Sequence, residues 1–335
     1  TSFASMGNGD TQFTLDRFGW YEEGDHGAAE ITITQDTDVP TGQGFAKSLK
    51  AVCATVDTSI DAGTIAYVSQ KFEGQFLQHL AKGTSGAKST TLSFWCKSNL
   101  TGTFTISVID QDNTRMFSTS YSPASANTWE KFIINIPADT TGALDNDNAS
   151  SFRINWNLQA GTNKSNGALA SAWEAQAEGD RAVGQTNFYS STDNNWYITG
   201  VQWEVGDAAT DFEVLPFDVQ LARCQRYYQQ VPHTASGSYQ GTPFWNLNAN
   251  SAITRFPLPV TMRTAPTGAV SGTLNTDIKA YFNGGYQTLT ACSVSDTTDD
   301  SVRVDLTTSG GFTANEAGGI YIVTTSGRFT MTSEF

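Results

Sequence analysis

Apolar and polar residues alternate in short runs along most of the chain, which is the pattern of half-buried antiparallel strands. Clusters of Asp, Asn, Ser, Thr and Gly separate the runs, as expected of turns. In the first part of the chain the runs cover residues 29–34, 46–55, 64–72, 90–97, 102–109, 118–122, 129–136, 152–158, 186–191 and 196–205. About ten such strands predict a β-sandwich, and among sandwiches a jelly roll.

A second β-rich region follows after one helical segment. Its runs cover residues 252–257, 269–271, 278–282, 288–294, 301–306, 319–324 and 329–335. The helix is expected to begin after Pro216, carry Asp218 in its first turn and end before Pro232. The sequence therefore predicts an all-β chain with an N-terminal jelly roll (1–215), a linking helix (216–231) and a C-terminal β-sandwich (232–335).

The predicted helix has one apolar stripe. Leu221, Cys224, Tyr227 and Tyr228 fall along one side, and Arg223 falls on another. A short helix of this kind must bury its stripe against something. It can pack between the two domains of one chain, or against the same helix of partner chains.

The charge of the chain argues against two classes of partner. With 33 acidic and 19 basic residues the net charge is −14, which disfavours nucleic acid and anionic membrane surfaces. It fits an exposed particle component, a binder of neutral glycans, or ordinary solubility charge. No apolar run approaches the roughly 20 residues that span a bilayer, and no secretory signal is present. The four cysteines form no CxxC pair, so buried free thiols are expected.

Catalytic and metal-binding motifs are not evident. The three histidines lie in unlike contexts, and the sequence contains no GxSxG, HExxH or phosphate-binding loop. The chain is therefore expected not to be an enzyme and to need no cofactor. The segment DNDN offers Asp145 and Asp147 as oxygen ligands for a structural calcium ion, although Asp and Asn are also common turn residues.

Aromatic residues beside amides and carboxylates are the candidate binding residues, because sugars stack on flat rings and hydrogen bond to polar side chains. The first region offers two such groups and the second region one pair of aromatics. These candidates are Trp156 and Asn157; Asn195, Trp196 and Tyr197; and Trp245 and Tyr281. Half-buried positions in the sandwich, or a trimer interface in the second region, are the alternatives for these rings.

The sequence also carries resemblances. GVQWEVGDAATDFEVLPF at 200–217, LARCQRYYQ at 221–229 and FPLPVTMRTAPT at 256–267 resemble a recurrent module of bacteriophage tail fibres and related virion proteins. TLSFWCKS at 91–98 and NTWEKFIINIP at 127–137 resemble carbohydrate-binding-module jelly rolls, which often hold one calcium ion. TSF at positions 1–3 resembles an internal motif of the fibre family, which implies a preceding anchor segment.

The first resemblance implies a virion protein made in the cytoplasm of a bacterial host. Its expected partners are two further copies in a homotrimer, other phage tail or virion proteins, and glycans of the host cell surface. The sequence leaves two alternatives open. One is a stand-alone carbohydrate-binding module, and the other is a ligand-free structural fibre of the head or baseplate.

Overall fold

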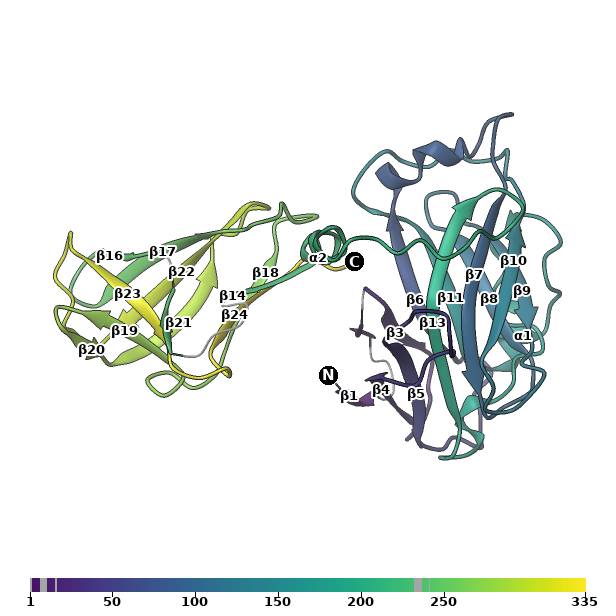
Figure 1. Ribbon diagram of the computed structural model, residues 1–335, viewed down its shortest axis with the longest axis horizontal. Helices are drawn as coiled ribbons and strands as arrows, with labels where there is room; N and C mark the ends of the chain where they lie inside the picture. Colours follow the sequence, from purple (N-terminus) through teal and green to yellow (C-terminus); the bar gives the residue numbers. More distant parts are fainter. Residues whose placement is uncertain (1, 7–10, 16, 232–236, 241) are drawn as a thin grey trace. The chain divides into compact units, whose positions relative to one another are not determined.

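The chain folds into two compact units. The computed structural model describes residues 2–6, 11–15, 17–231, 237–240 and 242–335. The first unit ends at Val214, and the second comprises Leu215–Glu334 (Figure 1). Each unit is built from antiparallel sheets, in agreement with the predicted all-β fold.

The first unit is a jelly-roll β-sandwich of two sheets. Sheet A runs in the order β1 (Ser2–Met6), β4 (Glu30–Asp36), β5 (Ser48–Thr55), β13 (Asn195–Val205), β7 (Thr90–Ser98) and β10 (Glu130–Ile136). Sheet B runs in the order β12 (Glu174–Ala175), β9 (Arg115–Tyr121), β8 (Phe104–Asp110), β11 (Ser150–Ala160), β6 (Ile65–Glu73), β3 (Gly19–Glu23) and β2 (Thr11–Phe13). Strands distant in sequence are neighbours in both sheets, as in a jelly roll.

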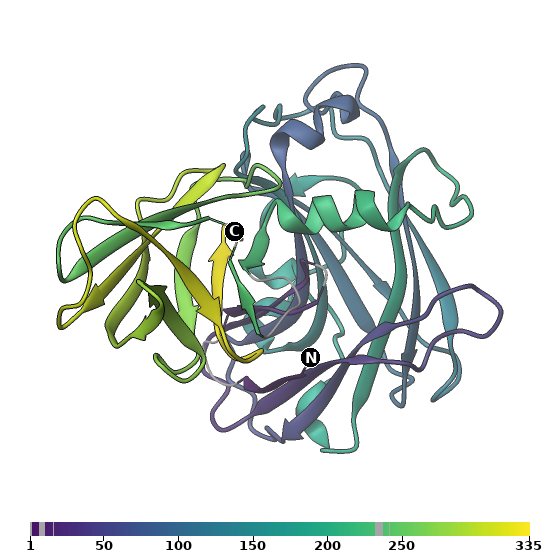
Figure 2. The same ribbon diagram turned by 60° about the vertical axis from the view of Figure 1, so that its left-hand side comes forward.

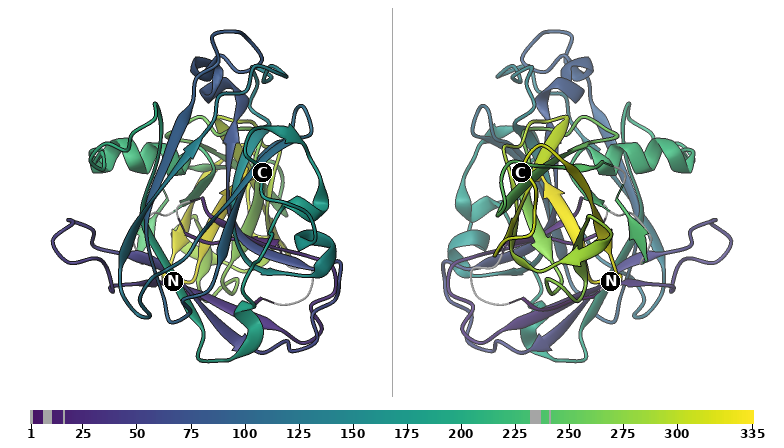
Figure 3. Two further views of the ribbon diagram at one scale, coloured as in Figure 1. Left: turned by 90° about the vertical axis from the view of Figure 1, so that its right-hand side faces the viewer. Right: turned by 90° about the vertical axis from the view of Figure 1, so that its left-hand side faces the viewer.

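The alternation of apolar residues builds the core between the two sheets. Leu92 and Phe94 of β7 face Ile154 and Trp156 of β11, and all four are fully buried. The segment between β4 and β5, residues 37–47, extends from this unit as a long loop (Figure 3). Short 3-10 turns η1 (Gly74–Phe76) and η2 (Gln78–Leu80) follow β6.

One predicted strand is wrong. Residues 186–191 form a turn with the 3-10 segment η4 (Phe188–Ser190), and Phe188 and Tyr189 are still fully buried. Asn194 holds the turn, because its side-chain amide donates to the Phe188 carbonyl at 2.9 Å and to the Ser190 hydroxyl at 3.0 Å. Local side-chain bonds of this kind compete with strand pairing.

Residues 161–187, here called the strap, cover part of the outer face of sheet B. The strap contains α1 (Thr162–Ser165), β12 and the 3-10 turn η3 (Glu178–Asp180). Asn157 of β11 donates to the Arg181 carbonyl at 3.1 Å, and Gln185 accepts from the Thr105 amide at 2.9 Å. The Arg181 guanidinium, itself buried, pairs with Glu23 at 2.8 Å. Polar groups on this face are thus bonded to the strap.

The second unit is also a β-sandwich. Its small sheet has the order β14 (Tyr228–Val231), β24 (Arg328–Thr332) and β18 (Thr267–Ser271). Its larger sheet has the order β20 (Gly285–Gln287), β19 (Ile278–Phe282), β23 (Ala317–Ile322), β16 (Phe244–Asn246), β17 (Ser251–Pro257), β22 (Ser301–Thr308) and β21 (Leu289–Ser295), with β15 (Ser238–Tyr239) also paired to β23. Phe244, Phe256 and Phe329 lie in the core between them.

The helix is shorter than predicted. Helix α2 covers Phe217–Gln225, and residues 228–231 form β14 instead of a last helical turn (Figure 2). In β14, Tyr228 and Gln230 pair with Thr332 and Thr330 of β24. Strand pairing with the end of the chain, a contact that local periodicity does not contain, overrides the helical pattern here.

Candidate functional site

Most of the predicted sugar-binding residues of the first unit are buried. Trp156 and Trp196 point between the sheets with no exposed surface, and the Trp196 indole donates to the Tyr121 hydroxyl at 2.9 Å. Asn157 lies under the strap, also with no exposed surface. The assignment of these three residues to a sugar site is therefore wrong, because strand alternation and the strap turn them away from solvent.

The other two candidates of this group lie near the surface but are constrained. The Tyr197 ring, only 8% exposed, belongs to the outer face of sheet A between Lys50 and Lys97, its cross-strand neighbours. The ammonium of Lys97 lies 4.4 Å from the centre of the ring. The Asn195 side chain donates back to the Asp193 carbonyl at 3.0 Å. Neither side chain offers a flat, open surface.

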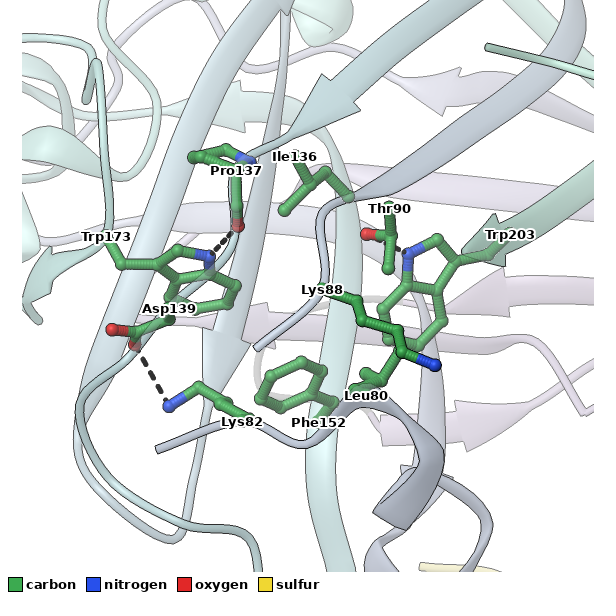
Figure 4. A pocket seen from close by; sticks show the side chains of 10 residues that line it. All are labelled: Leu80, Lys82, Lys88, Thr90, Ile136, Pro137, Asp139, Phe152, Trp173 and Trp203. Atoms are coloured by element: carbon green, nitrogen blue, oxygen red, sulfur yellow. Dashed lines mark hydrogen bonds and ion pairs between the residues drawn. The ribbon is translucent and has the colours of Figure 1, made fainter. Parts of the chain in front are cut away.

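A small hollow at one end of the first sandwich is lined by aromatic rings (Figure 4). Phe152 stacks between Trp173 and Trp203, with ring centres 5.4 and 5.9 Å away. The indole of Trp173 donates to the Pro137 carbonyl at 2.7 Å, and that of Trp203 to the Thr90 hydroxyl at 2.8 Å. The cavity of about 20 Å³ is comparable to the space of one water molecule, which is far too small for a sugar ring.

A buried lysine lies at the same end of the first sandwich. The Lys82 ammonium lies 2.5 Å from Asp110 and 3.0 Å from Asp139, and it donates to the carbonyls of Thr141 and Gly142 at 2.8 and 2.9 Å. Burial alone raises the pKa of Asp139, but hydrogen bonds from Arg115 and Lys82 outweigh it and hold the pKa below its usual value. All charges of the cluster are therefore matched, which is the arrangement of a structural ion pair.

The predicted calcium ligands do not form a ligand set by themselves. The Asp147 carboxylate accepts from the Ala149 amide at 2.9 Å, and the Asp145 amide donates to Asp112 at 2.9 Å. Across the described part of the chain, no group of three or more His, Cys, Asp or Glu side chains could hold a metal ion. Asp145 and Asp147 would need additional oxygens from backbone or water to bind calcium.

The second unit carries an exposed cluster of four tyrosines on the outer face of its larger sheet. We call Tyr239, Tyr281, Tyr286 and Tyr321 the tyrosine ring, because each of them contacts two of the others. The ring centres of these contacts are 5.6 Å apart for 239–281, 5.5 Å for 281–286, 5.7 Å for 286–321 and 5.0 Å for 321–239. Tyr239 and Tyr286 are 53% and 52% exposed.

Strand register creates the tyrosine ring. Tyr281 pairs with Tyr286 across the β19–β20 hairpin and with Gly319 of β23, and Tyr239 pairs with Tyr321. A Cβ atom at Gly319 would lie 3.1 Å from the Tyr239 ring, so the glycine lets that ring lie close to the sheet. The rings thus form one continuous aromatic surface.

Polar groups around the tyrosine ring are available to a ligand. None of the four hydroxyls makes a hydrogen bond to another part of the chain that the structure describes, and none is buried. The Lys279 ammonium lies 4.8 Å from the centre of the Tyr286 ring. Trp245, 49% exposed, follows on the same face, since it pairs with Ala317 two residues before Gly319. Aromatic faces beside free hydroxyls and a cation can stack on and hydrogen bond to a sugar.

The structure therefore brings together the two predicted residues of the second unit, Tyr281 and Trp245, on one sheet face. The sequence alone did not select Tyr321. The pattern that could have indicated Tyr321 is the alternation in GGIYI. Ile320 and Ile322 are buried, so Tyr321 between them must point outward.

The predicted interface stripe is only partly exposed. Leu221 on α2 is 42% exposed and Cys224 is half-buried, but Tyr227 and Tyr228 lie beyond the helix. Tyr227 is buried, and Tyr228 points outward from β14 with 45% exposure. The prediction that these four residues form one stripe along a helix is therefore wrong. Helix α2 instead exposes Phe217, Val219 and Leu221.

None of the four cysteines forms a disulfide in the described part of the chain. Cys53 and Cys96 are buried, as predicted, whereas Cys224 and Cys292 are half-buried, so the expectation of four buried thiols is only partly confirmed. Burial raises the pKa of Cys53 to about 11, which makes this thiol unreactive at neutral pH. No described helix is both long enough and apolar enough to cross a bilayer.

Comparison with known proteins gives structural similarities only. No family model matches the sequence, and no curated protein matches it. Among solved structures, the active domain of tailspike protein 4 of bacteriophage CBA120 aligns over 61% of this chain and 21% of its own, with 16% identity and a TM-score of 0.33. The family 11 carbohydrate-binding module of a Clostridium thermocellum cellulase aligns over 61% and 99%, with 11% identity and a TM-score of 0.30.

A tandem of two family 22 carbohydrate-binding modules from Paenibacillus barcinonensis aligns over 99% of this chain and 93% of its own, with 10% identity and a TM-score of 0.27. This chain thus spans about a fifth of the tailspike domain's length, but nearly all of the family 11 module. The functional interpretation therefore depends on the chain's own residues.

Proposed function

We propose that this chain is a non-enzymatic virion protein of a bacteriophage, a homotrimeric tail fibre that binds glycans of the host cell surface. It is made in the bacterial cytoplasm and, in the particle, contacts other tail or virion proteins. The resemblance of residues 200–217 and 221–229 to phage fibres supports the virion role. The observation that carries glycan binding is the exposed tyrosine ring of the second unit.

The distribution of charge supports the second unit as the one that meets a cell. Residues 215–334 contain eight acidic and seven basic side chains, whereas residues 1–214 contain 25 acidic and 12 basic ones. A nearly neutral unit approaches an anionic bacterial surface with little repulsion. Several weak sites held together in a trimer, with several fibres per particle, would give strong attachment.

Tyr286→Ala is expected to weaken glycan binding by about tenfold or more, because a central aromatic contact contributes on the order of 1–2 kcal/mol to binding. Its exposure predicts little change in the melting temperature. The measurement is binding of the intact chain to an array of bacterial surface polysaccharides. Tyr228→Ala, which removes a tyrosine of similar exposure from β14, is the control and should bind like the unmodified chain.

Equal binding by the two variants would exclude the tyrosine ring as the contact. If the intact chain binds no glycan, while its trimer is intact, the ligand-free structural fibre becomes the better interpretation.

The trimer itself is tested by native mass. Light scattering is expected to give about three times 36.1 kDa. Leu221→Glu places a charge on the exposed apolar side of α2 and is expected to shift the mass toward the monomer, because the contact would have to bury that charge. Gln220→Glu, on the same helix, is the control. A monomer at all concentrations would contradict the homotrimer.

A further inference from the structure

The outer face of sheet A holds a second aromatic surface that the tyrosine ring does not explain. On this face Trp95 of β7 is half-buried, with Thr199 of β13 directly opposite on one side and Lys131 of β10 on the other. Directly opposite residues have Cβ atoms about 5 Å apart, so the Trp95 and Lys131 side chains leave the sheet side by side on one surface. Ile133, 53% exposed, continues the apolar surface along β10.

Lys131 is a cation without an ion-pair partner among the residues that the structure describes. Two carboxylates of the same sheet, those of Glu130 and Glu204, make hydrogen bonds to other groups. Glu130 accepts from the backbone amides of Ala124 and Ser125 at 2.9 and 3.0 Å. Glu204 accepts from the Thr210 amide at 2.9 Å and from the Thr210 hydroxyl at 2.7 Å. Burial raises the pKa of Glu204, but hydrogen bonds from Gln202 and Thr210 and, to a smaller extent, the charge of Lys131 hold it below its usual value. Because the Lys131 ammonium makes no ion pair with a described carboxylate, it can still pair with an external anion.

The other lysine beside Trp95 differs from Lys131, because it has an ion-pair partner within the chain. Lys97 is 9% exposed, pairs closely with Asp38 and lies over the rings of Trp129 and Tyr197. Asp38 in turn accepts from the Trp129 indole at 2.9 Å. This neighbouring cluster is internally neutralised and packed. It packs beside Trp95, while Lys131 on the other side supplies an exposed positive charge.

Loop residues border the surface on its other side. The Thr199 hydroxyl donates to the Lys47 carbonyl at 2.8 Å, which holds the long 37–47 loop against β13. Phe45 of this loop contacts Phe212, with ring centres 5.0 Å apart, and lies against Gly200, where a Cβ atom would approach the Phe45 ring to 2.4 Å. Trp95 thus lies between an aromatic loop and an open ammonium.

We propose that Trp95 and Lys131 form a binding site for an acidic saccharide, with the pyranose stacked on the indole and its carboxylate paired with the ammonium. A flat ring beside a cation matches both the apolar face and the negative group of a uronic acid. The site is separate from the tyrosine ring and does not rest on the function proposed for it.

The test uses the intact chain with trigalacturonate as the probe and its methyl ester as the matched neutral ligand. Titration calorimetry is expected to show binding of the acid that weakens with added salt, because the contact includes an exposed ion pair. Trp95→Ala should weaken binding of both ligands by about tenfold or more. Lys131→Gln should weaken binding of the acid by about two- to fivefold and leave the ester unchanged. Lys88→Gln, at an exposed lysine elsewhere in the unit, should change neither.

A second measurement does not depend on the stability of the alanine variant. The chain has eight tryptophans, and the indole NMR signal missing from Trp95→Phe identifies Trp95. Trigalacturonate should shift this signal and leave that of the buried Trp196 unchanged. The proposal is overturned if the Trp95 signal does not move, or if acid and ester bind equally. A change of native mass in Trp95→Ala would also overturn it, since the face would then be an interface between copies.

Tyr286→Ala separates the two sites. Trigalacturonate binding that survives this substitution and is lost in Trp95→Ala supports the site on sheet A, whatever the tyrosine ring binds. Binding lost in Tyr286→Ala and retained in Trp95→Ala assigns the saccharide to the second unit and contradicts the proposal.

Discussion

Trp196→Ala is expected to destabilise the first unit by about 3–5 kcal/mol, because it removes a fully buried indole from between the two sheets. It also removes the 2.9 Å hydrogen bond from the indole to the Tyr121 hydroxyl, which is itself buried. Domains are typically stable by about 5–15 kcal/mol, so this loss is a large part of the total. Urea denaturation followed by near-ultraviolet circular dichroism measures it.

Trp95→Ala is the matched control for Trp196→Ala. Trp95 lies on the neighbouring strand of the same sheet, but on its outer face and half-buried. Its loss should cost clearly less stability, because less apolar surface leaves a packed environment. Suppose that the Trp196→Ala chain is as stable as the unmodified one but binds glycan more weakly. Trp196 would then belong to the binding surface, which would contradict its buried position.

Lys82→Met is expected to destabilise the first unit by about 3–5 kcal/mol, because it leaves the buried carboxylate of Asp110 without a cation and leaves Asp139 with Arg115 as its only one. The side chains of Asp110 and Asp139 are 0% and 4% exposed. The carbonyls of Thr141 and Gly142 would also lose a donor. The deficit should shrink as the pH falls, because Lys82 helps to hold the pKa of Asp139 below its usual value, and the stability that comes from this lowering is lost once Asp139 is protonated. Denaturation at several pH values tests both points.

The exposed pair of Arg255 and Asp296 in the second unit is the control for this effect. These side chains are 48% and 51% exposed, so Arg255→Ala should cost less than about 1 kcal/mol. Adding Asp110→Asn to Lys82→Met should recover part of the loss, because it removes one of the buried charges. If Lys82→Met lowered the free energy of unfolding no more than Arg255→Ala, the buried ion pairs of Lys82 would not stabilise this end of the sandwich.

Local pattern predicted the strands well wherever alternation was long and regular. The runs 90–97, 129–136 and 196–205 correspond to β7, β10 and β13 within one or two residues. The same reasoning failed at two segments. Residues 186–191 form a turn that is held by nearby side-chain hydrogen bonds, and residues 228–231 pair as a strand with the distant strand β24. Periodicity describes which residues share a face, and it carries no information about what covers that face.

The candidate site shows this limit most clearly. Alternation alone placed Trp196 and Tyr197 on opposite faces of one strand, but only the pairing of sheets A and B decided that the Trp196 face is the interior. The tyrosine ring depends on residues from β15, β19, β20 and β23, which are up to 82 positions apart in sequence, from Tyr239 to Tyr321. No local signal could join them.

The sequence by itself determined the all-β class and the two β-rich regions, because these follow from composition and from the two-residue repeat of strands. The tertiary structure alone decided which aromatics are exposed, because exposure depends on which strands pair and on segments such as the strap that cover a face. It also decided that Lys82 is buried in ion pairs and that Lys131 is exposed and makes none with the residues that the structure describes, since the partners of a charge are set by packing across the fold.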